Sequence, residues 1–177
     1  MILDGARDDR IYGAVYGCYQ DKCCLYSGDL PPQLQMAAPY LVQLEKDDRF
    51  TNYAIDQGWG KAWGIFLRSE TNMKTLRRHL RGLLRVRDES GRGLIFRYYD
   101  PRVLGIYLPT CQPGELRTFF GPVESYLFES DDPEVLLEYG FDSRELSGRR
   151  TVLQPVAMGL RPTCDENHPD NPKRQKV

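Results

Sequence analysis

The chain has 177 residues, 41% of them hydrophobic, which suits one globular domain with a core of its own. Its 24 lysines and arginines almost balance its 25 aspartates and glutamates, so the formal net charge is −1. This balance argues against a general nucleic-acid binder and against a protein that attaches to acidic membranes.

The sequence also shows neither a membrane-spanning helix nor a secretory leader. No run approaches the ~18 apolar residues of a membrane helix, and Asp4 follows the short apolar start too soon for a secretory leader. The five cysteines form an odd set without a Cys-x-x-Cys pair, as expected for free thiols in a reducing compartment. We therefore expect a cytoplasmic protein, and a first strand that begins at Ile2 suggests that the native start lies upstream.

Short strands alternate with short helices in the first part of the chain. Strands are predicted at residues 2–3, 23–26, 38–44 and 63–68. Helices are predicted from Asp8 or Asp9 to about Tyr19, as one turn after Pro31-Pro32, and over residues 50–57. The strand at 63–68 is almost continuously apolar, which is typical of a strand covered on both faces.

The clearest helix is expected over residues 71–85, capped by Ser69 or Thr71. One side of it is an apolar stripe, and the other side carries Arg77, Arg78, Arg81 and Arg85. Three interpretations of this arginine face remain open. It binds phosphates, as in a nucleic-acid-binding module; it is a solvated helix face; or it pairs with acidic groups of a protein partner.

The rest of the chain continues the alternation up to about residue 130. A hairpin is predicted at 86–99, then helices at 101–107 and 113–120, a strand at 123–129, and a further helix at 133–139. The fold class is therefore α/β, with a mixed β-sheet flanked by helices and a short helical or flexible C-terminal appendage. We expect an α/β lobe at 2–130, a short extension at 131–160 that is a possible remnant of a helical lobe, and a flexible tail at 161–177.

A catalytic constellation is hard to find in this sequence. The two histidines, His79 and His168, have no metal-binding spacing around them, and no nucleophile or phosphate-loop motif is present. Asp4 and Asp100 each follow a strand, so one alternative is an enzyme that uses these strand-end carboxylates, with Mg²⁺ as the ion they would suit. The other interpretation is that each aspartate caps a helix or pairs with a nearby arginine.

Both tryptophans, Trp59 and Trp63, lie among glycines, which permit tight turns and close backbone approach. One of them is expected in the core. The other is a candidate anchor at a protein interface, where buried tryptophans contribute strongly to binding.

Several segments, taken in order, resemble a known bacterial family. They are Leu3-Asp4-Gly5-Ala6, Ala38-Pro39-Tyr40-Leu41, the run Trp63 to Ser69, Leu76 to Arg81, Phe96 to Leu104, Leu108-Pro109 and Phe119 to Pro122. Over about residues 2–130 this ordered set is similar to the type VI secretion adaptor-chaperones of the Tap or Tec type, long catalogued as a domain of unknown function. Phe96-Arg97-Tyr98-Tyr99-Asp100-Pro101-Arg102 is the most specific piece.

The resemblance implies a protein that is not an enzyme and needs no cofactor or metal. Members of that family bind a toxic effector in the producing cell and help to load it onto the tip of the VgrG spike. The implied partners are thus an effector segment and VgrG, with no nucleic acid and no membrane. Family members often carry a longer helical C-terminal lobe, so this chain is either a short variant or a truncated one.

Within this interpretation we assign two groups of residues. The candidate partner-binding residues are Trp59, Arg77, Arg78 and Arg81, because arginine and tryptophan are enriched at interfaces. Arg97, Asp100 and Arg102 are expected to form an internal cluster of ion pairs that holds the exit of a strand.

Overall fold

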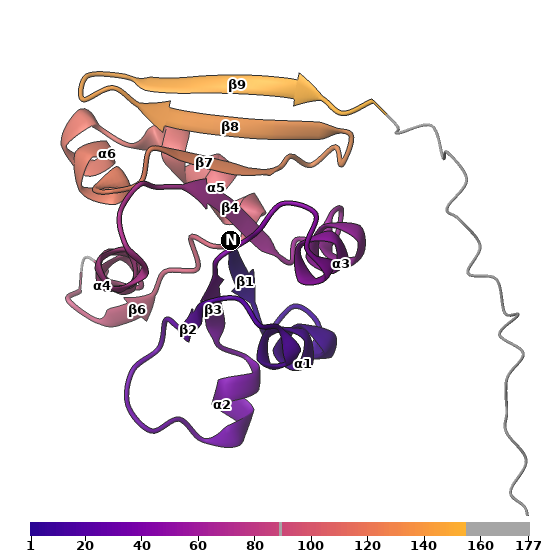
Figure 1. Ribbon diagram of the computed structural model, residues 1–177. Coiled ribbons are helices and arrows are strands. Elements are labelled where there is room, and N and C mark those ends of the chain that lie inside the picture. Colours follow the sequence, from indigo (N-terminus) through magenta and orange to yellow (C-terminus); the bar gives the residue numbers. More distant parts are fainter. Residues whose placement is uncertain (89, 155–177) are drawn as a thin grey trace, which may run out of the picture.

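The computed structural model describes residues 1–88 and 90–154. Its strands are β1 (Ile2–Asp4), β2 (Lys22–Cys24), β3 (Pro39–Val42), β4 (Gly64–Arg68), β5 (Arg85–Arg87), β6 (Gly93–Ile95), β7 (Ser125–Glu129), β8 (Val135–Phe141) and β9 (Leu146–Val152). Seven of them form one sheet in the order β2-β3-β1-β4-β7-β8-β9, and β5 and β6 form a separate hairpin (Figure 1). The predicted α/β class is confirmed.

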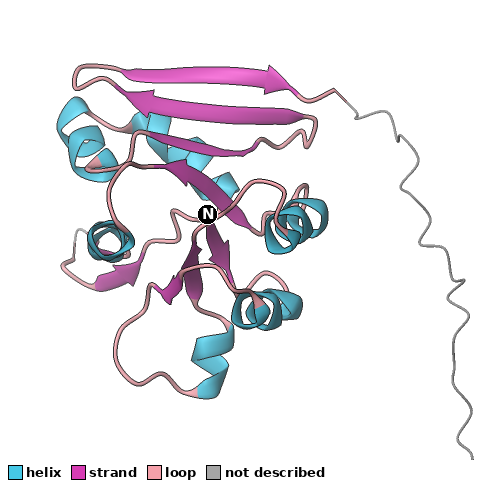
Figure 2. Cartoon of the chain, viewed as in Figure 1, coloured by secondary structure: helices cyan, strands magenta, loops and turns pink. Residues whose placement is uncertain are grey.

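Helices cover both faces of the seven-stranded sheet. They are α1 (Asp9–Gly17), α2 (Pro32–Met36), α3 (Arg49–Gly58), α4 (Met73–Leu83), α5 (Pro101–Tyr107), the 3₁₀ turn η1 (Leu108–Thr110) and α6 (Pro113–Phe120). Figure 2 shows helices on both sides of the strands, with α1 and α3 opposite α4 and α6. Among the described residues, no helix has the length and apolar character needed to cross a membrane.

Alternate residues of the central strands enter two different cores. Ile2 and Ile65 pack in the core formed with α4, α5 and α6, whereas Leu3 and Tyr40 pack in the core formed with α1 and α3. Successive side chains of a strand point to opposite faces, so even a three-residue strand serves both cores. The two cores together fix α4 on one face of the sheet and α3 on the other.

The strand β4 lies close against β1. A Cβ atom at Gly64 would collide with the carbonyl oxygen of Ile2, which explains why glycine follows Trp63 there. The expectation that this strand is covered on both faces holds only for its first part, because Gly64 and Ile65 are buried and Arg68 is exposed.

The sequence patterns also locate helix ends. Asp8 caps α1 and Asp100 caps α5, each accepting a hydrogen bond from the backbone two residues on, as predicted. The cap of α4 differs from the prediction: Asn72, not Ser69 or Thr71, accepts from the Thr75 amide at 2.9 Å. Ser69 instead donates to the Pro122 carbonyl at 2.6 Å, so it ties the start of this segment to the loop after α6.

Two predictions about the sheet are wrong. All pairings between the described strands are antiparallel, so the parallel pairs of a mixed sheet are not found among them. Residues 133–139 were predicted as a helix, but from Val135 onward they lie in β8, which pairs with β7 from Ser125↔Gly140 to Glu129↔Leu136. Ladder hydrogen bonds and packing of β8 against β7 outweigh a weak local helix preference there.

The C-terminal appendage is thus a β-hairpin as far as it is described. β8 and β9 pair from Val135↔Val152 to Phe141↔Leu146, and they extend the same sheet. The remainder of the predicted extension at 131–160 and the predicted tail at 161–177 lie outside the described residues, which end at 154.

Candidate functional site

The arginine face of α4 borders a large hollow of the described surface. This groove, about 990 Å³ in volume, runs between α4, the segment after β2, and α2. Its basic residues are Lys74, Arg77, Arg78, Arg81 and Arg85. Lys74, Arg77 or Arg78, and Arg81 recur every three or four residues, which is the spacing that places side chains on one side of a helix. The helix ends at Leu83, earlier than predicted, so Arg85 belongs to β5. We call this hollow the α4 groove.

Burial of the other helix face aims the arginines into the groove. Leu76 and Leu80 are buried in the core, and Leu80 has no exposed surface. The hydroxyl of Tyr98 donates to the Leu80 carbonyl at 2.9 Å, and a nitrogen of His79 lies 2.9 Å from the Phe119 carbonyl. Because α4 is fixed on its inner side in this way, its rotation about its own axis is set, and the arginines face outward.

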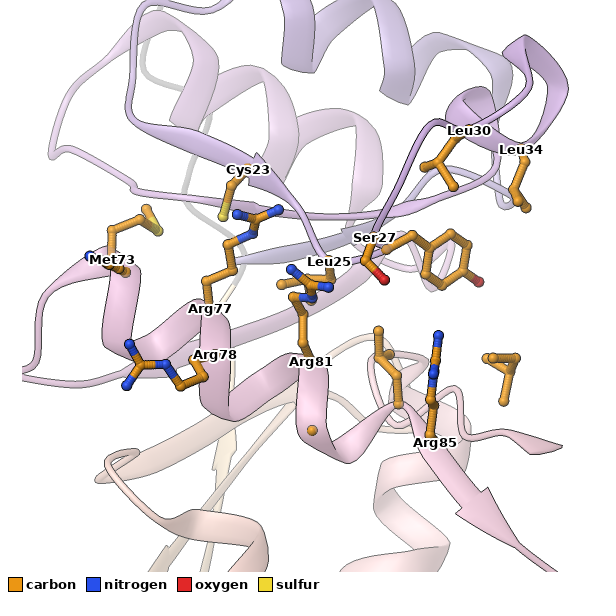
Figure 3. A pocket seen from close by; sticks show the side chains of 15 residues that line it. Cys23, Leu25, Ser27, Leu30, Leu34, Met73, Arg77, Arg78, Arg81 and Arg85 are labelled. Atoms are coloured by element: carbon orange, nitrogen blue, oxygen red, sulfur yellow. The ribbon is translucent and has the colours of Figure 1, made fainter. Parts of the chain in front are cut away.

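The groove arginines differ in how they are held. The Arg77 side chain donates from Nε to the Cys24 carbonyl at 3.1 Å, which leaves its terminal nitrogens free to bind another group. Figure 3 shows Arg77 and Arg81 rising from α4 toward the segment that carries Cys23, Leu25 and Ser27, with Arg85 beyond the end of the helix. Arg78 points away from that segment.

Apolar side chains line the remainder of the groove. Leu30 and Leu34 come from the α2 side, Leu25 from the segment after β2, and Ile95 from the β5-β6 hairpin. Leu34 is 43% exposed and Ile95 is 54% exposed. The surface therefore combines a basic wall with apolar side chains that lack a full covering in the chain itself.

Strand-end aspartates and arginines form a second feature, at the start of α5. Asp100 accepts from the side chain of Arg102 at 2.6 Å, as the expected ion pair. Arg97 does not pair with Asp100; it pairs with Asp4, for which the sequence left open a metal site, a helix cap or a pair with an arginine. The predicted cluster of three residues is in fact two adjacent ion pairs, Asp4–Arg97 and Asp100–Arg102, which we call the aspartate pairs.

Both aspartates are buried, with exposed fractions of 1% for Asp4 and 4% for Asp100. Asp4 also accepts from the Ala6 amide at 3.1 Å, and Asp100 accepts from the Arg102 amide at 3.1 Å. Burial alone would raise the pKa of Asp100, but the hydrogen bonds and charge of Arg102 outweigh burial, and the net pKa is lowered. Each carboxylate is therefore already engaged by an arginine and a backbone amide.

Trp59 lies away from the arginines that the sequence grouped with it. It follows α3, and its indole nitrogen donates to the Pro133 carbonyl at 2.6 Å. Its ring packs 6.3 Å from that of Phe66 and lines an apolar hollow that shares no residue with the α4 groove. Trp63, which is 2% exposed, is the core tryptophan.

Glu129 fixes the loop after Trp59. Its carboxylate accepts from the amides of Gly60 and Ala62, the latter at 2.6 Å. Gly60 has a φ of 76°, in the left-handed region that favours glycine. Together with the hydrogen bond from Trp59 to Pro133, these contacts hold the loop after α3 against the end of β7 and the β7–β8 connection, so Trp59 has a structural role.

Among residues 1–88 and 90–154, no cluster of three histidine, cysteine or carboxylate side chains is arranged to hold a metal ion. The cysteines described, Cys18, Cys23, Cys24 and Cys111, are free. Burial raises the pKa of Cys23 and of Cys24, which disfavours the thiolate form that a nucleophile or a metal ligand requires.

Half of the groove was not predictable from the sequence. The arginines were found from their helical spacing, but no pattern indicated that Leu30, Leu34 and Ile95 lie beside them. Leu30 and Leu34 precede the middle of α4 by more than 40 residues, and Ile95 follows it by 17; only the antiparallel order of β2 and β3 brings the first two near.

Comparison with known proteins gives a family for most of the chain. Residues 1–118 match the model of the family described as "Domain of unknown function (DUF4123)". The chain belongs to this family. No curated protein and no solved structure is significantly similar to the chain. The matched region contains α4, the aspartate pairs and the whole α4 groove, whereas β7, β8 and β9 follow it.

Proposed function

We propose that this DUF4123 protein is a cytoplasmic adaptor-chaperone of a bacterial type VI secretion system. In this role it binds a toxic effector in the producing cell and promotes loading of the effector onto the VgrG spike. The observation that carries the proposal is the ordered set of motifs from Leu3 to Pro122, which resembles the adaptor family and falls largely within the family match.

The α4 groove supports a binding role of this kind. A loading factor has to hold a partner and then release it, which favours an interface of moderate size with arginine contacts rather than a large apolar one. The groove offers arginines on a helix that one core holds in place, and partly exposed apolar side chains from α2 and the β5-β6 hairpin. Such a surface recognises a protein segment without any covalent chemistry.

The enzyme alternative depends on two carboxylates that the chain itself engages. It required the carboxylates of Asp4 and Asp100 to be available to a metal ion or a substrate. Both are buried, and each is paired with an arginine. Binding of Mg²⁺ would first have to displace these arginines.

Co-purification tests the proposal. The full chain is expressed with a tag beside the proteins encoded by its neighbouring genes, and the purified complex is analysed by size-exclusion chromatography and mass spectrometry. We expect a stable complex with an effector, and association of VgrG with that complex. A chain that co-purifies with neither of these neighbours would contradict the proposal.

Deletion of the gene supplies the functional test. In the producing bacterium we expect loss of delivery of the one neighbouring effector while the secretion machinery continues to release other cargo. Loss of all secretion would instead indicate a part of the machinery, and normal delivery of the effector would contradict an adaptor role.

A further inference from the structure

The α4 groove carries positive charge that the described part of the chain does not neutralise. None of the five ion pairs found among the described residues involves Lys74, Arg77, Arg78, Arg81 or Arg85. The described residues that line the groove include no aspartate or glutamate. The neutral thiol of Cys23, whose pKa burial raises, does not offset this charge either.

This excess is local, because the whole chain is close to neutral. The formal net charge is −1, so the cations of α4 are balanced by carboxylates elsewhere. Gathering several cations along one wall of a hollow costs free energy through their mutual repulsion, and an anionic ligand in the groove would remove that cost. The chemistry of the wall therefore selects for negative charge.

The opposite wall excludes a purely ionic ligand. Leu30 and Leu34 on this wall, and Ile95 beside Arg85 in the β5-β6 hairpin, present apolar surface, and a phosphate group or a bare carboxylate would leave it uncovered. A nucleic acid would cover such surface by stacking bases on aromatic side chains. The one aromatic residue among the described lining residues is Tyr26, beside five cations. A protein segment with acidic and apolar side chains matches both walls.

The spacing of the cations gives a length scale for this segment. Arg77 and Arg81 lie four residues apart on α4, so their backbone positions are separated by about 6 Å along the helix, and Arg85 follows just beyond the helix in β5. Acidic residues four apart on a partner helix repeat at the same distance. Arginine also binds a carboxylate through two parallel hydrogen bonds, which favours carboxylates over other polar groups.

From these observations we infer that the α4 groove binds an acidic, amphipathic segment of a protein partner. Its carboxylates pair with Arg77, Arg81 and Arg85, and its apolar side chains cover Leu30, Leu34 and Ile95. This inference rests on the proposed function for the identity of the partner, which is the effector, and it adds which surface binds and which chemistry is recognised.

Reversal of the charge of two arginines in the α4 groove tests this inference. The Arg81→Glu/Arg85→Glu double variant reverses two groove cations and leaves the Arg77–Cys24 hydrogen bond in place. The matched control is Lys46→Glu/Arg49→Glu, which makes the same change in net charge at two exposed residues on the α3 side of the sheet. Circular dichroism and thermal unfolding establish that both variants are folded.

The probes are two labelled peptides of the same length and leucine pattern, one with glutamates at its polar positions and one with glutamines. In fluorescence anisotropy with the full chain, we expect the glutamate peptide to bind more tightly than the glutamine peptide, and we expect its binding to weaken with added salt. The groove variant should lose about tenfold or more of this affinity, and the control variant should keep it. Equal binding of the two peptides, or equal loss in both variants, would overturn the inference.

Two further arms separate this inference from its alternatives and from the proposed function. A labelled single-stranded oligonucleotide that binds more tightly than the glutamate peptide, and that the groove variant no longer binds, would overturn it in favour of nucleic acid. An effector that co-purifies equally with wild type and with the groove variant would also overturn it, while the adaptor function would stand. If the glutamate peptide binds in the groove but no effector co-purifies with wild type, the adaptor function fails and the preference of the groove stands.

Discussion

Two groups of arginines lie within about 30 residues of each other in the sequence, and they end in opposite situations. Arg97, just before α5, and Arg102, in its first turn, are paired with buried aspartates of the same chain. Arg81 on α4 and Arg85 in β5 line an open groove with no carboxylate among its described residues. The residue type is the same, so the position of the acidic residues decides which arginines stabilise the fold and which remain available to a partner.

This comparison also separates two kinds of evidence for a site. The aspartate pairs stand out in the sequence, because Asp100-Pro101-Arg102 is a strong local pattern, yet their side chains engage one another. The groove is weakly marked in the sequence, but its charge has no internal partner in the described chain. We therefore place recognition at the groove and stability at the aspartate pairs.

The largest expected effect concerns the buried side of α4, which holds the groove in place. Leu80→Ala removes a side chain with no exposed surface and leaves a cavity in the core. We expect the free energy of unfolding to fall by about 3 kcal/mol. Urea denaturation followed by circular dichroism measures this loss, and a change below about 1 kcal/mol would show that α4 is not held by that core.

A smaller loss is expected at the aspartate pairs. Arg97→Ala leaves the buried carboxylate of Asp4 without its cation, although Arg97 itself is 45% exposed and water partly replaces it. We expect the free energy of unfolding to decrease by about 2 kcal/mol. The control is Arg92→Ala, which breaks a surface pair with Asp88 and should change stability by less than about 0.5 kcal/mol. Equal effects of the two variants would mean that Asp4 and Arg97 make no special contribution.

The Asp100–Arg102 pair predicts a pH dependence. In the folded protein the pKa of Asp100 is lowered, so its ionised form stabilises the fold above the unfolded pKa of about 3.9. This contribution is lost as pH falls through the folded-state pKa. Asp100→Asn retains a helix cap but not the charge, so its stability should fall less steeply than that of wild type below about pH 4. Urea denaturation at several pH values measures both slopes; parallel curves would contradict the prediction.

The smallest effect is expected on the open side of α4. Arg81→Ala, one residue from Leu80, removes no ion pair found in the described chain, so stability should change by less than about 0.5 kcal/mol. The same variant should weaken binding of the co-purified effector. A loss of stability comparable to that of Leu80→Ala would place Arg81 with the structural arginines and remove the contrast between the two groups.

Most helices were predictable because their signals are local. The caps at Asp8 and Asp100 and the prolines at the starts of α2, α5 and α6 act through residues one to three positions away. Strand pairing was less predictable, because it joins residues far apart in the chain. The segment 133–139 shows the difference: its leucines and glutamates favour a helix locally, and only its position beside β7 makes it a strand.

The amino-acid sequence alone determined the α/β class, the arginine face of α4 and the motifs that resemble the adaptor family. It also indicated that Asp100 would cap a helix and bind a nearby arginine. These features depend on helical period and short-range hydrogen bonds, which act between residues close in the chain.

Tertiary structure decided which of these residues meet. It separated Trp59 from the arginines, joined Arg97 to Asp4 across 93 positions of sequence, and placed Leu34 and Ile95 beside α4. The physical reason is that the order of strands in the sheet fixes long-range neighbours, and that order depends on the packing of two cores rather than on any local pattern.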